Sequence, residues 1–145
     1  MVEELKKDLI LAMKSKDKEK LTVIRMVKAA MDLEHIDKKR EINDDLLIDV
    51  LNKQIKMRKD SIAEFMKAGR EDLVSKTQNE VDILMKYLPE QLSEDEVMTI
   101  INEAFDSVKP EGQKDMGKIM QLVSPKLKGR TDMKNVSQII RSKLQ

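Results

Sequence analysis

The chain has 145 residues, 40% apolar and 38% charged, and its 28 basic and 27 acidic side chains give a net charge of +1. So small a net charge excludes disorder driven by charge repulsion. Cysteine is absent and His35 is the only histidine, which excludes disulfides, thiolate metal sites, cysteine nucleophiles and a multi-histidine zinc site within one chain. Three aromatic residues are too few for a base-stacking platform that binds single-stranded nucleic acid. Scarce glycine and proline, with much Lys, Glu, Leu and Met, predict an all-α protein.

No segment of the sequence predicts membrane insertion or export. The longest uncharged apolar run near the start, Leu9 to Met13, is far shorter than the roughly 20 residues of a spanning helix or the 7 or more of a signal core. Glu3 and Glu4 argue against an import presequence. We therefore expect a cytoplasmic protein with no membrane partner.

Apolar spacing predicts four helices before Pro89. The first covers about residues 2–14, and the second covers about 18–38 with Asp17 as its cap. The second carries two apolar stripes, which predicts packing on two sides. The third begins after the cap Asn43 and ends at Ala68-Gly69, and the fourth follows almost at once, so the two should form an antiparallel hairpin.

Three further helices are predicted after Pro89. Ser93 and Glu96 form a capping box at the start of the first, with Leu92 and Val97 at the staple positions. A short helix should cover about residues 114–123, with a turn or short extension after it. Thr131 or Asp132 should cap the last helix, which ends at Leu144. The sequence thus predicts an N-terminal four-helix bundle (residues 1–88) and a C-terminal three-helix bundle (residues 89–145).

Basic side chains concentrate near the C-terminus. Residues 89–106 carry six acidic and no basic side chains, whereas residues 107–145 carry nine basic and three acidic ones. The helical spacing places most of these cations opposite the apolar stripes. One basic surface of the kind that binds phosphate backbones could be built from seven of them, Lys114, Lys118, Lys126, Lys128, Arg130, Lys134 and Arg141. The alternative is that they are ordinary solvated helix faces.

Three patterns resemble functional sites, but another explanation fits each better. Residues 112–118 have the glycine and lysine spacing of a P-loop, but Ile119 replaces the hydroxyl residue, no strand precedes them and Asp115 would repel an anion. We expect Gly117 instead to let another helix approach closely. His35 is best explained as a partly exposed helix residue. The acidic clusters at 44–45 and 94–96 are explained by capping, so no metal site and no cofactor are predicted.

Arg58 is harder to assign, because it lies on the apolar stripe of the third helix. A buried cation must be paired or must line a cleft. The two interpretations are an ion pair at the domain interface and a ligand contact. Together with Lys59 and Tyr87, Arg58 marks a candidate interdomain or ligand cleft.

Five stretches together resemble the YqeY-like family over nearly the whole chain. They are residues 87–92 (YLPEQL), 115–120 (DMGKIM), 128–132 (KGRTD), 21–28 (LTVIRMVK) and 58–61 (RKDS). The second half is also similar to the tail domain of the B subunit of tRNA-dependent amidotransferases, which helps to hold tRNA. The resemblance implies a four-helix bundle followed by a three-helix bundle and a link to tRNA, but no active site. The sequence departs from the family where Met133 stands in place of a common glycine.

The function expected from these observations is that of a non-catalytic helical accessory protein. It would bind tRNA, or a protein that acts on tRNA, through the seven basic residues. One alternative is a protein–protein adaptor, whose surfaces would use some of the 11 methionines. Another is a component of a carbon–nitrogen ligase with glutamine as amido-N-donor, which would need partner subunits for its chemistry.

Overall fold

A computed structural model describes all 145 residues and contains seven α-helices and no strand, which confirms the all-α prediction. The helices are α1 (Val2–Ser15), α2 (Lys18–Lys38), α3 (Asp44–Lys67), α4 (Glu71–Met85), α5 (Glu94–Val108), α6 (Met116–Leu127) and α7 (Met133–Leu144), with a 3₁₀ turn, η1 (Gln113–Asp115), before α6. The chain divides into two compact units, Met1–Leu88 and Pro89–Gln145. Each unit has its own hydrophobic core.

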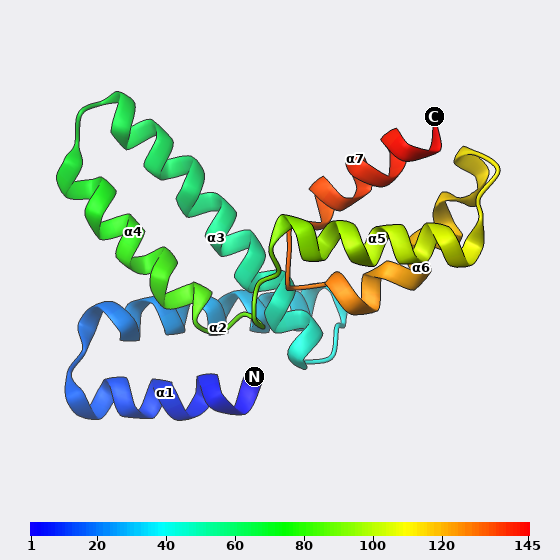
Figure 1. The fold of residues 1–145 in the computed structure, drawn as a ribbon. Coiled ribbons are helices and arrows are strands. Elements are labelled where there is room, and N and C mark those ends of the chain that lie inside the picture. The colour runs from blue at the N-terminus through cyan, green and yellow to red at the C-terminus, as the bar shows by residue number, and fades with distance from the viewer. The chain divides into compact units, whose positions relative to one another are not determined.

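The N-terminal unit consists of two helical hairpins, α1 with α2 and α3 with α4 (Figure 1). α2 packs against both helices of the second hairpin. The core of this unit comes from α2, the first half of α3, the second half of α4 and Tyr87, and α1 contributes the buried Leu5. The other halves of α3 and α4 extend beyond this core, so Ile62 and Val74 are only partly buried. Arg58 and Thr77 are the last buried side chains before that extension.

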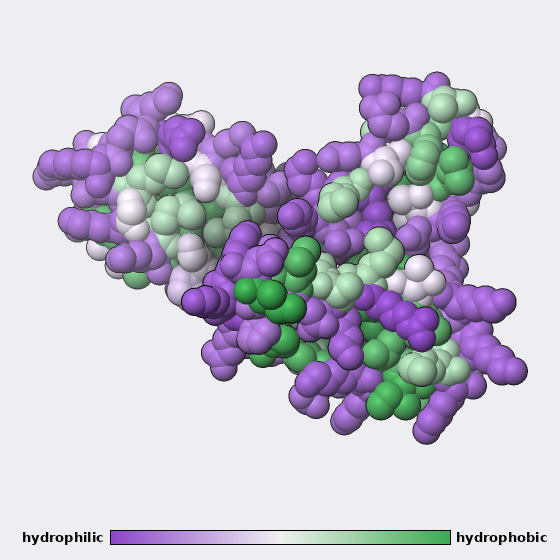
Figure 2. All heavy atoms as spheres, turned by 180° about the vertical axis from the view of Figure 1, so that it is seen from behind, coloured by the Kyte–Doolittle hydropathy of each residue, from purple (hydrophilic) through white to green (hydrophobic).

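The predicted packing of α2 on two sides is wrong. Val23, Ile24 and Val27 are buried, but the second stripe leaves Met26 45% and Leu33 59% exposed. Only one side of α2 is covered, because α1, α3 and α4 all contribute to the same core. Seen from behind, the region of α1 and α2 shows apolar side chains among hydrophilic ones (Figure 2).

The C-terminal unit is organised around α6, which packs against both α5 and α7. Ile119, Val123 and Leu127 repeat every four residues along α6 and are fully buried. α6 continues through Pro125 to Leu127, so the region after residue 123 is the short helical extension rather than a turn. Pro125 carries no N–H, so the carbonyl four residues earlier in α6 loses its helical hydrogen bond.

Four of the helices begin with a side-chain cap at a residue that the sequence predicts. Asp17, Asn43, Ser93 and Asp132 each accept a hydrogen bond from a backbone N–H two or three residues later, at 3.0–3.2 Å. In the predicted capping box, the Ser93 hydroxyl also donates to the Glu96 carboxylate. These bonds satisfy donors that a helix leaves free at its start.

Candidate nucleic-acid interface

The turn between α6 and α7 fixes two of the seven basic residues, Lys128 and Arg130. Lys128 N–H donates to Ser124 at 2.9 Å, and Arg130 N–H donates to Leu127 at 2.9 Å. Gly129 has a φ of 78°, a left-handed conformation in which glycine is favoured. The tight turn therefore presents Lys128 at the surface, while Arg130 is partly buried.

The segment that follows Leu88 is held to this same turn. Leu92 N–H donates to the Arg130 carbonyl at 2.9 Å, and the Arg130 guanidinium donates to the Glu90 carbonyl at 3.1 Å. Gln91 donates to the Gly129 carbonyl at 2.8 Å. Residues 90–92 are therefore part of the C-terminal unit. The Arg130 guanidinium already has a structural partner, so it is less available to a phosphate than the other cations.

The remaining cations lie on α6, on α7 and on η1, and all of them are exposed. Two are neutralised by neighbours three residues away: Lys114 lies 3.2 Å from Glu111, and Lys118 lies 3.6 Å from Asp115. Three form no ion pair within the protein, namely Lys126, Lys134 and Arg141. These three are the side chains best placed to receive phosphate oxygens.

Asp115 is structural rather than a ligand. It is 9% exposed, and its carboxylate accepts a hydrogen bond from Glu111 N–H at 2.9 Å. That bond, helped by the charge of Lys118, holds the pKa of Asp115 below its usual range. The expected role of Gly117 is wrong, because a Cβ atom there would meet no atom within 4 Å. No other helix approaches it closely.

The three residues of the candidate cleft have different partners and different exposure in the structure. Arg58 is buried, and its Nε lies 3.4 Å from the Glu80 carboxylate of α4. Lys59 is exposed. The Tyr87 hydroxyl donates instead to Asp8 of α1, and burial together with this bond raises the pKa of Tyr87 above its usual range. All of these contacts lie within the N-terminal unit.

Arg58 is held by further contacts, so its conformation is well defined. Nη1 donates to the Gln54 side chain at 2.7 Å and to the Gln54 carbonyl at 3.3 Å, and Nη2 lies 3.4 Å from the Met26 sulfur. The ion pair with Glu80 joins α3 to α4. Arg58 Nε nevertheless has no partner with hydrogen-bond geometry. An ion pair was one of the two interpretations of Arg58 offered by the sequence, but it was expected at the domain interface, and the partner Glu80 lies in the same unit as Arg58.

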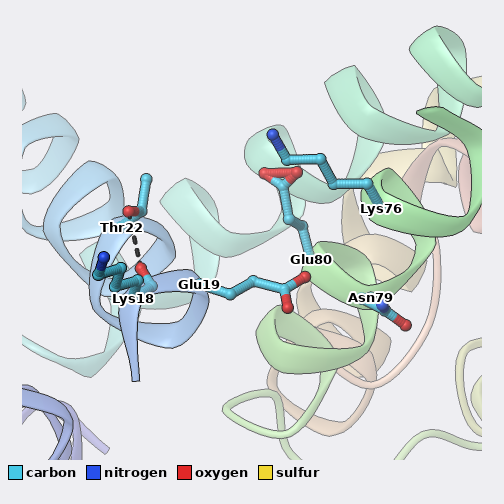
Figure 3. Close-up of a pocket in the computed structure, with 6 residues that line it drawn as sticks. All are labelled: Lys18, Glu19, Thr22, Lys76, Asn79 and Glu80. Atoms are coloured by element: carbon cyan, nitrogen blue, oxygen red, sulfur yellow. Dashed lines mark hydrogen bonds between the residues drawn. The ribbon is translucent and has the colours of Figure 1, made fainter. Parts of the chain in front are cut away.

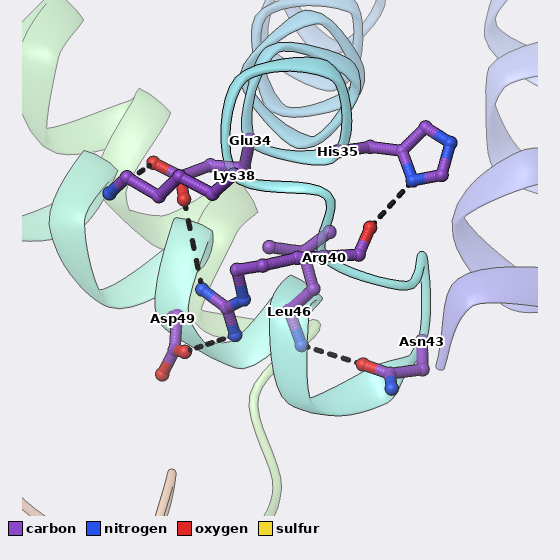
Figure 4. A network of polar contacts seen from close by, with 7 residues as sticks. All are labelled: Glu34, His35, Lys38, Arg40, Asn43, Leu46 and Asp49. Carbon is purple, nitrogen blue, oxygen red and sulfur yellow. Dashed lines mark hydrogen bonds and ion pairs between the residues drawn. The ribbon is translucent and has the colours of Figure 1, made fainter.

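His35 belongs to a second polar network (Figure 4). Its Nδ1 lies within hydrogen-bonding distance of the Arg40 carbonyl, and the Arg40 guanidinium pairs with Asp49 at 2.7 Å and with Glu34 at 3.8 Å. This network ties the end of α2 to the start of α3. It gives the exposed His35 a structural explanation.

No three His, Cys, Asp or Glu side chains lie close enough together to hold a metal ion. No helix has the length and apolar character that crossing a membrane requires.

The structure therefore defines an all-α protein of two helical units, with exposed cations on the second. A family model described as Yqey-like protein matches residues 2–144, and the chain belongs to this family. Curated relatives named "Altered inheritance of mitochondria protein 41, mitochondrial" occur in three fungi. The chain is 36% identical over 128 residues to the Pyrenophora tritici-repentis protein, 48% over 84 residues to that of Kluyveromyces lactis, and 40% over 109 residues to that of Saccharomyces cerevisiae.

These alignments cover 87%, 57% and 72% of this chain, in that order. They cover 70%, 45% and 58% of the respective relatives. The chain thus spans only part of each of these proteins. The predicted cytoplasmic location is contradicted, because the relatives are named mitochondrial proteins.

Proposed function

We propose that this YqeY-like protein is a helical accessory protein that binds tRNA through exposed cations of its C-terminal unit. One observation carries the proposal: Lys126, Lys134 and Arg141 are exposed and form no ion pair within the protein. Phosphate oxygens are the partners that such unpaired surface cations fit best. Lys128 stands at the turn between the same two helices.

The chemistry of this surface favours recognition of the backbone and shape of folded RNA. The C-terminal unit has a single aromatic residue, Phe105, and Lys143 lies 5.3 Å from its ring centroid. A ring engaged in that way offers no stacking platform for an unpaired base. Cations on helices instead match the phosphates and 2′-hydroxyls of double-helical RNA.

The test is a triple variant, Lys126→Gln, Lys134→Gln and Arg141→Gln, with labelled tRNA binding measured by fluorescence anisotropy. Affinity falls as salt rises, and each lost phosphate contact should make this fall shallower. The magnitude of the slope of log affinity against log salt should decrease by about 0.7–0.9 for each lost contact. If all three side chains contact phosphates, the affinity near 0.1 M salt should fall by roughly 100-fold. Glutamine is chosen because it preserves helix propensity and size.

The matched control removes three exposed, unpaired lysines from the N-terminal unit, Lys7, Lys28 and Lys53, also by substitution with glutamine. We expect this variant to bind tRNA nearly as well as the wild type does. Equal losses in the two variants would contradict a site on the C-terminal unit and indicate non-specific electrostatic binding. No binding even at low salt would refute the proposal.

A second candidate function, a protein–protein adaptor, rests on the exposed apolar side chains of the N-terminal unit. Met26, Leu33, Ile36, Met57 and Met66 are each 45% or more exposed. Methionine adapts to partners of different shape, and such side chains commonly line helix-binding surfaces. Loss of partner binding on Met26→Gln and Leu33→Gln substitution, with tRNA binding absent, would favour this function.

A further inference from the structure

Met26 of α2 is the only polar partner of one end of the buried Arg58 guanidinium. Arg58 Nη2 lies 3.4 Å from the Met26 sulfur and makes no other polar contact, whereas Nη1 donates twice to Gln54 of α3. A thioether sulfur is a weak acceptor, so Nη2 is poorly satisfied. Nε has no hydrogen bond at all. The guanidinium therefore retains hydrogen-bonding capacity that a stronger acceptor could use.

The opposite side of the guanidinium offers no such acceptor. Glu80 of α4 is the one anion paired with Arg58. Glu80 also lines an open hollow of about 600 Å³ between α2 and α4, and the other lining residues are Lys18, Glu19, Thr22, Lys76 and Asn79 (Figure 3). None of these five makes a polar contact with Arg58. The acceptor that chemistry can improve is therefore on α2, at Met26.

Met26 is also accessible to a reagent in solution. It is 45% exposed, whereas Met31, the other methionine of α2, is 3% exposed and belongs to the core. Oxidation makes a methionine side chain polar, which disrupts a core. At Met26 the polar product would lie at the surface and beside a cation.

We infer that Met26 is an oxidation site whose sulfoxide binds Arg58 more tightly than the thioether does. A lone pair of the sulfur attacks hydrogen peroxide, the S–O bond forms as the O–O bond breaks, and the leaving hydroxide takes the proton of the transferred oxygen and departs as water. The sulfur is oxidised by two electrons and the peroxide is reduced. The sulfoxide oxygen is a strong acceptor, and the flexible side chain lets it reach Nη2. This inference concerns the N-terminal unit and does not depend on tRNA binding.

Oxidation at this position should strengthen the fold, because the contacts of Arg58 connect three helices. Met26 belongs to α2, Arg58 to α3 and Glu80 to α4. The exposed Met13 and Met66 have no polar partner at their sulfurs, so their oxidation gains no hydrogen bond. Methionine sulfoxide is reduced by dedicated reductases. The added bond is therefore gained and lost with the redox state of Met26.

The first experiment treats the full chain with hydrogen peroxide and follows each methionine by peptide mass spectrometry. Met26 should be oxidised at a rate similar to that of Met66, and at least about tenfold faster than Met31. Before Met31 reacts, urea unfolding monitored by Tyr87 fluorescence is compared for treated and untreated wild type and Met26→Leu. Relative to its effect on Met26→Leu, oxidation should lower the unfolding equilibrium constant of the wild type by about fivefold. A rate at Met26 as slow as that at Met31, or no such relative decrease, would overturn the inference.

The second experiment needs no oxidant. Glutamine resembles methionine sulfoxide in length and in its polar oxygen, so Met26→Gln should also lower the unfolding equilibrium constant by about fivefold. The matched control, Met66→Gln, should change this constant by less than about twofold. The gain from Met26→Gln should vanish in an Arg58→Leu background. A Met26→Gln protein no more stable than the wild type refutes the inference, as does a gain that persists without Arg58. If Arg58→Leu does not fold, the comparison of Met26→Gln with Met66→Gln still decides between the two outcomes.

Discussion

Replacing Arg58 by methionine tests whether the ion pair at the edge of the N-terminal core stabilises the fold. Methionine preserves the apolar stem of the side chain and removes the guanidinium, so the change isolates the polar contacts. Those contacts are the two hydrogen bonds to Gln54 and the ion pair with Glu80. We expect Arg58→Met to lower the free energy of unfolding of this unit.

The size of the effect follows from burial. The Arg58 side chain is 9% exposed, and losing one partner of a fully buried pair costs about 3–5 kcal/mol. Glu80 is 20% exposed, so water can solvate it once Arg58 is gone. The variant also avoids the free-energy cost of burying the guanidinium, and this offsets a further part of the lost stability. We therefore expect a loss of about 1–3 kcal/mol, or roughly 4–8 °C in melting temperature for each kcal/mol.

Tyr87 provides the assay, because it is the only tyrosine and the chain has no tryptophan. Its intrinsic fluorescence reports unfolding of the N-terminal unit alone. A double-mutant cycle with Glu80→Gln should show a coupling of about 1 kcal/mol with Arg58. The neighbouring, exposed Lys59→Met should change stability by less than about 0.5 kcal/mol. If Arg58→Met is as stable as the wild type, the ion pair does not stabilise this unit and the reasoning is refuted.

Four further outcomes are expected. Ser93→Ala should destabilise the C-terminal unit by about 0.5–2 kcal/mol. The measurement is urea unfolding followed by the NMR signals of backbone amides in this unit, and an unchanged midpoint would contradict a stabilising role of the Ser93 cap. Lys109→Gly should stabilise the same unit by up to about 1 kcal/mol, because Lys109 has a φ of 51°. The pKa of Asp115 is lower in the folded protein than in the unfolded chain. The ionised carboxylate therefore stabilises the fold fully above the unfolded-state pKa, and this stabilisation is lost as the pH falls through the folded-state pKa. Asp115→Asn should make the free energy of unfolding depend less on pH in the acid range. A glutamate-specific protease should cut after the exposed Glu90 only slowly, because that segment is hydrogen-bonded to the following unit, and rapid cleavage there would argue against those bonds.

The starts of the helices were more predictable from the sequence than their ends. Asp17, Asn43, Ser93 and Asp132 carry side chains that can bond to a free backbone N–H, so residue type alone reveals a cap. Gly69 reveals a helix end in the same way, and its φ is 69°. Three other helix ends adopt the left-handed conformation at Lys16, Lys39 and Lys109. Lysine has no preference for that conformation, so the tertiary structure imposes it and the sequence gives no signal.

Side-chain periodicity identified the apolar stripes of α2 but not which of them is buried. Both stripes have the same spacing, and burial depends on where α1, α3 and α4 pack. Gly117 shows the same limit, since a small residue permits close approach but does not cause it. Exposure of the basic residues was predictable from helical periodicity. Their pairing was not, because Lys114 and Lys118 find Glu111 and Asp115 through the geometry of η1.

The hollow between α2 and α4 could not have been found from the sequence. Its two halves, residues 18–22 and 76–80, lie more than 50 positions apart, and each half alone is an ordinary charged helix surface. Only the packing of α2 against α4 brings them together. Arg58 was the one available signal, because a cation within an apolar stripe requires a partner. That partner, Glu80, is a wall of the hollow.

Ionic strength tests the proposed tRNA interface by physical principle. Binding of tRNA by Lys126, Lys134 and Arg141 would release counterions from the phosphates, so its affinity must fall steeply as salt rises. We therefore expect tRNA affinity to fall by roughly 10-fold or more between about 50 and 200 mM salt. The triple variant that lacks these cations should show a shallower dependence than the wild type. An equally steep dependence in the two proteins would mean that these three side chains do not contact phosphates.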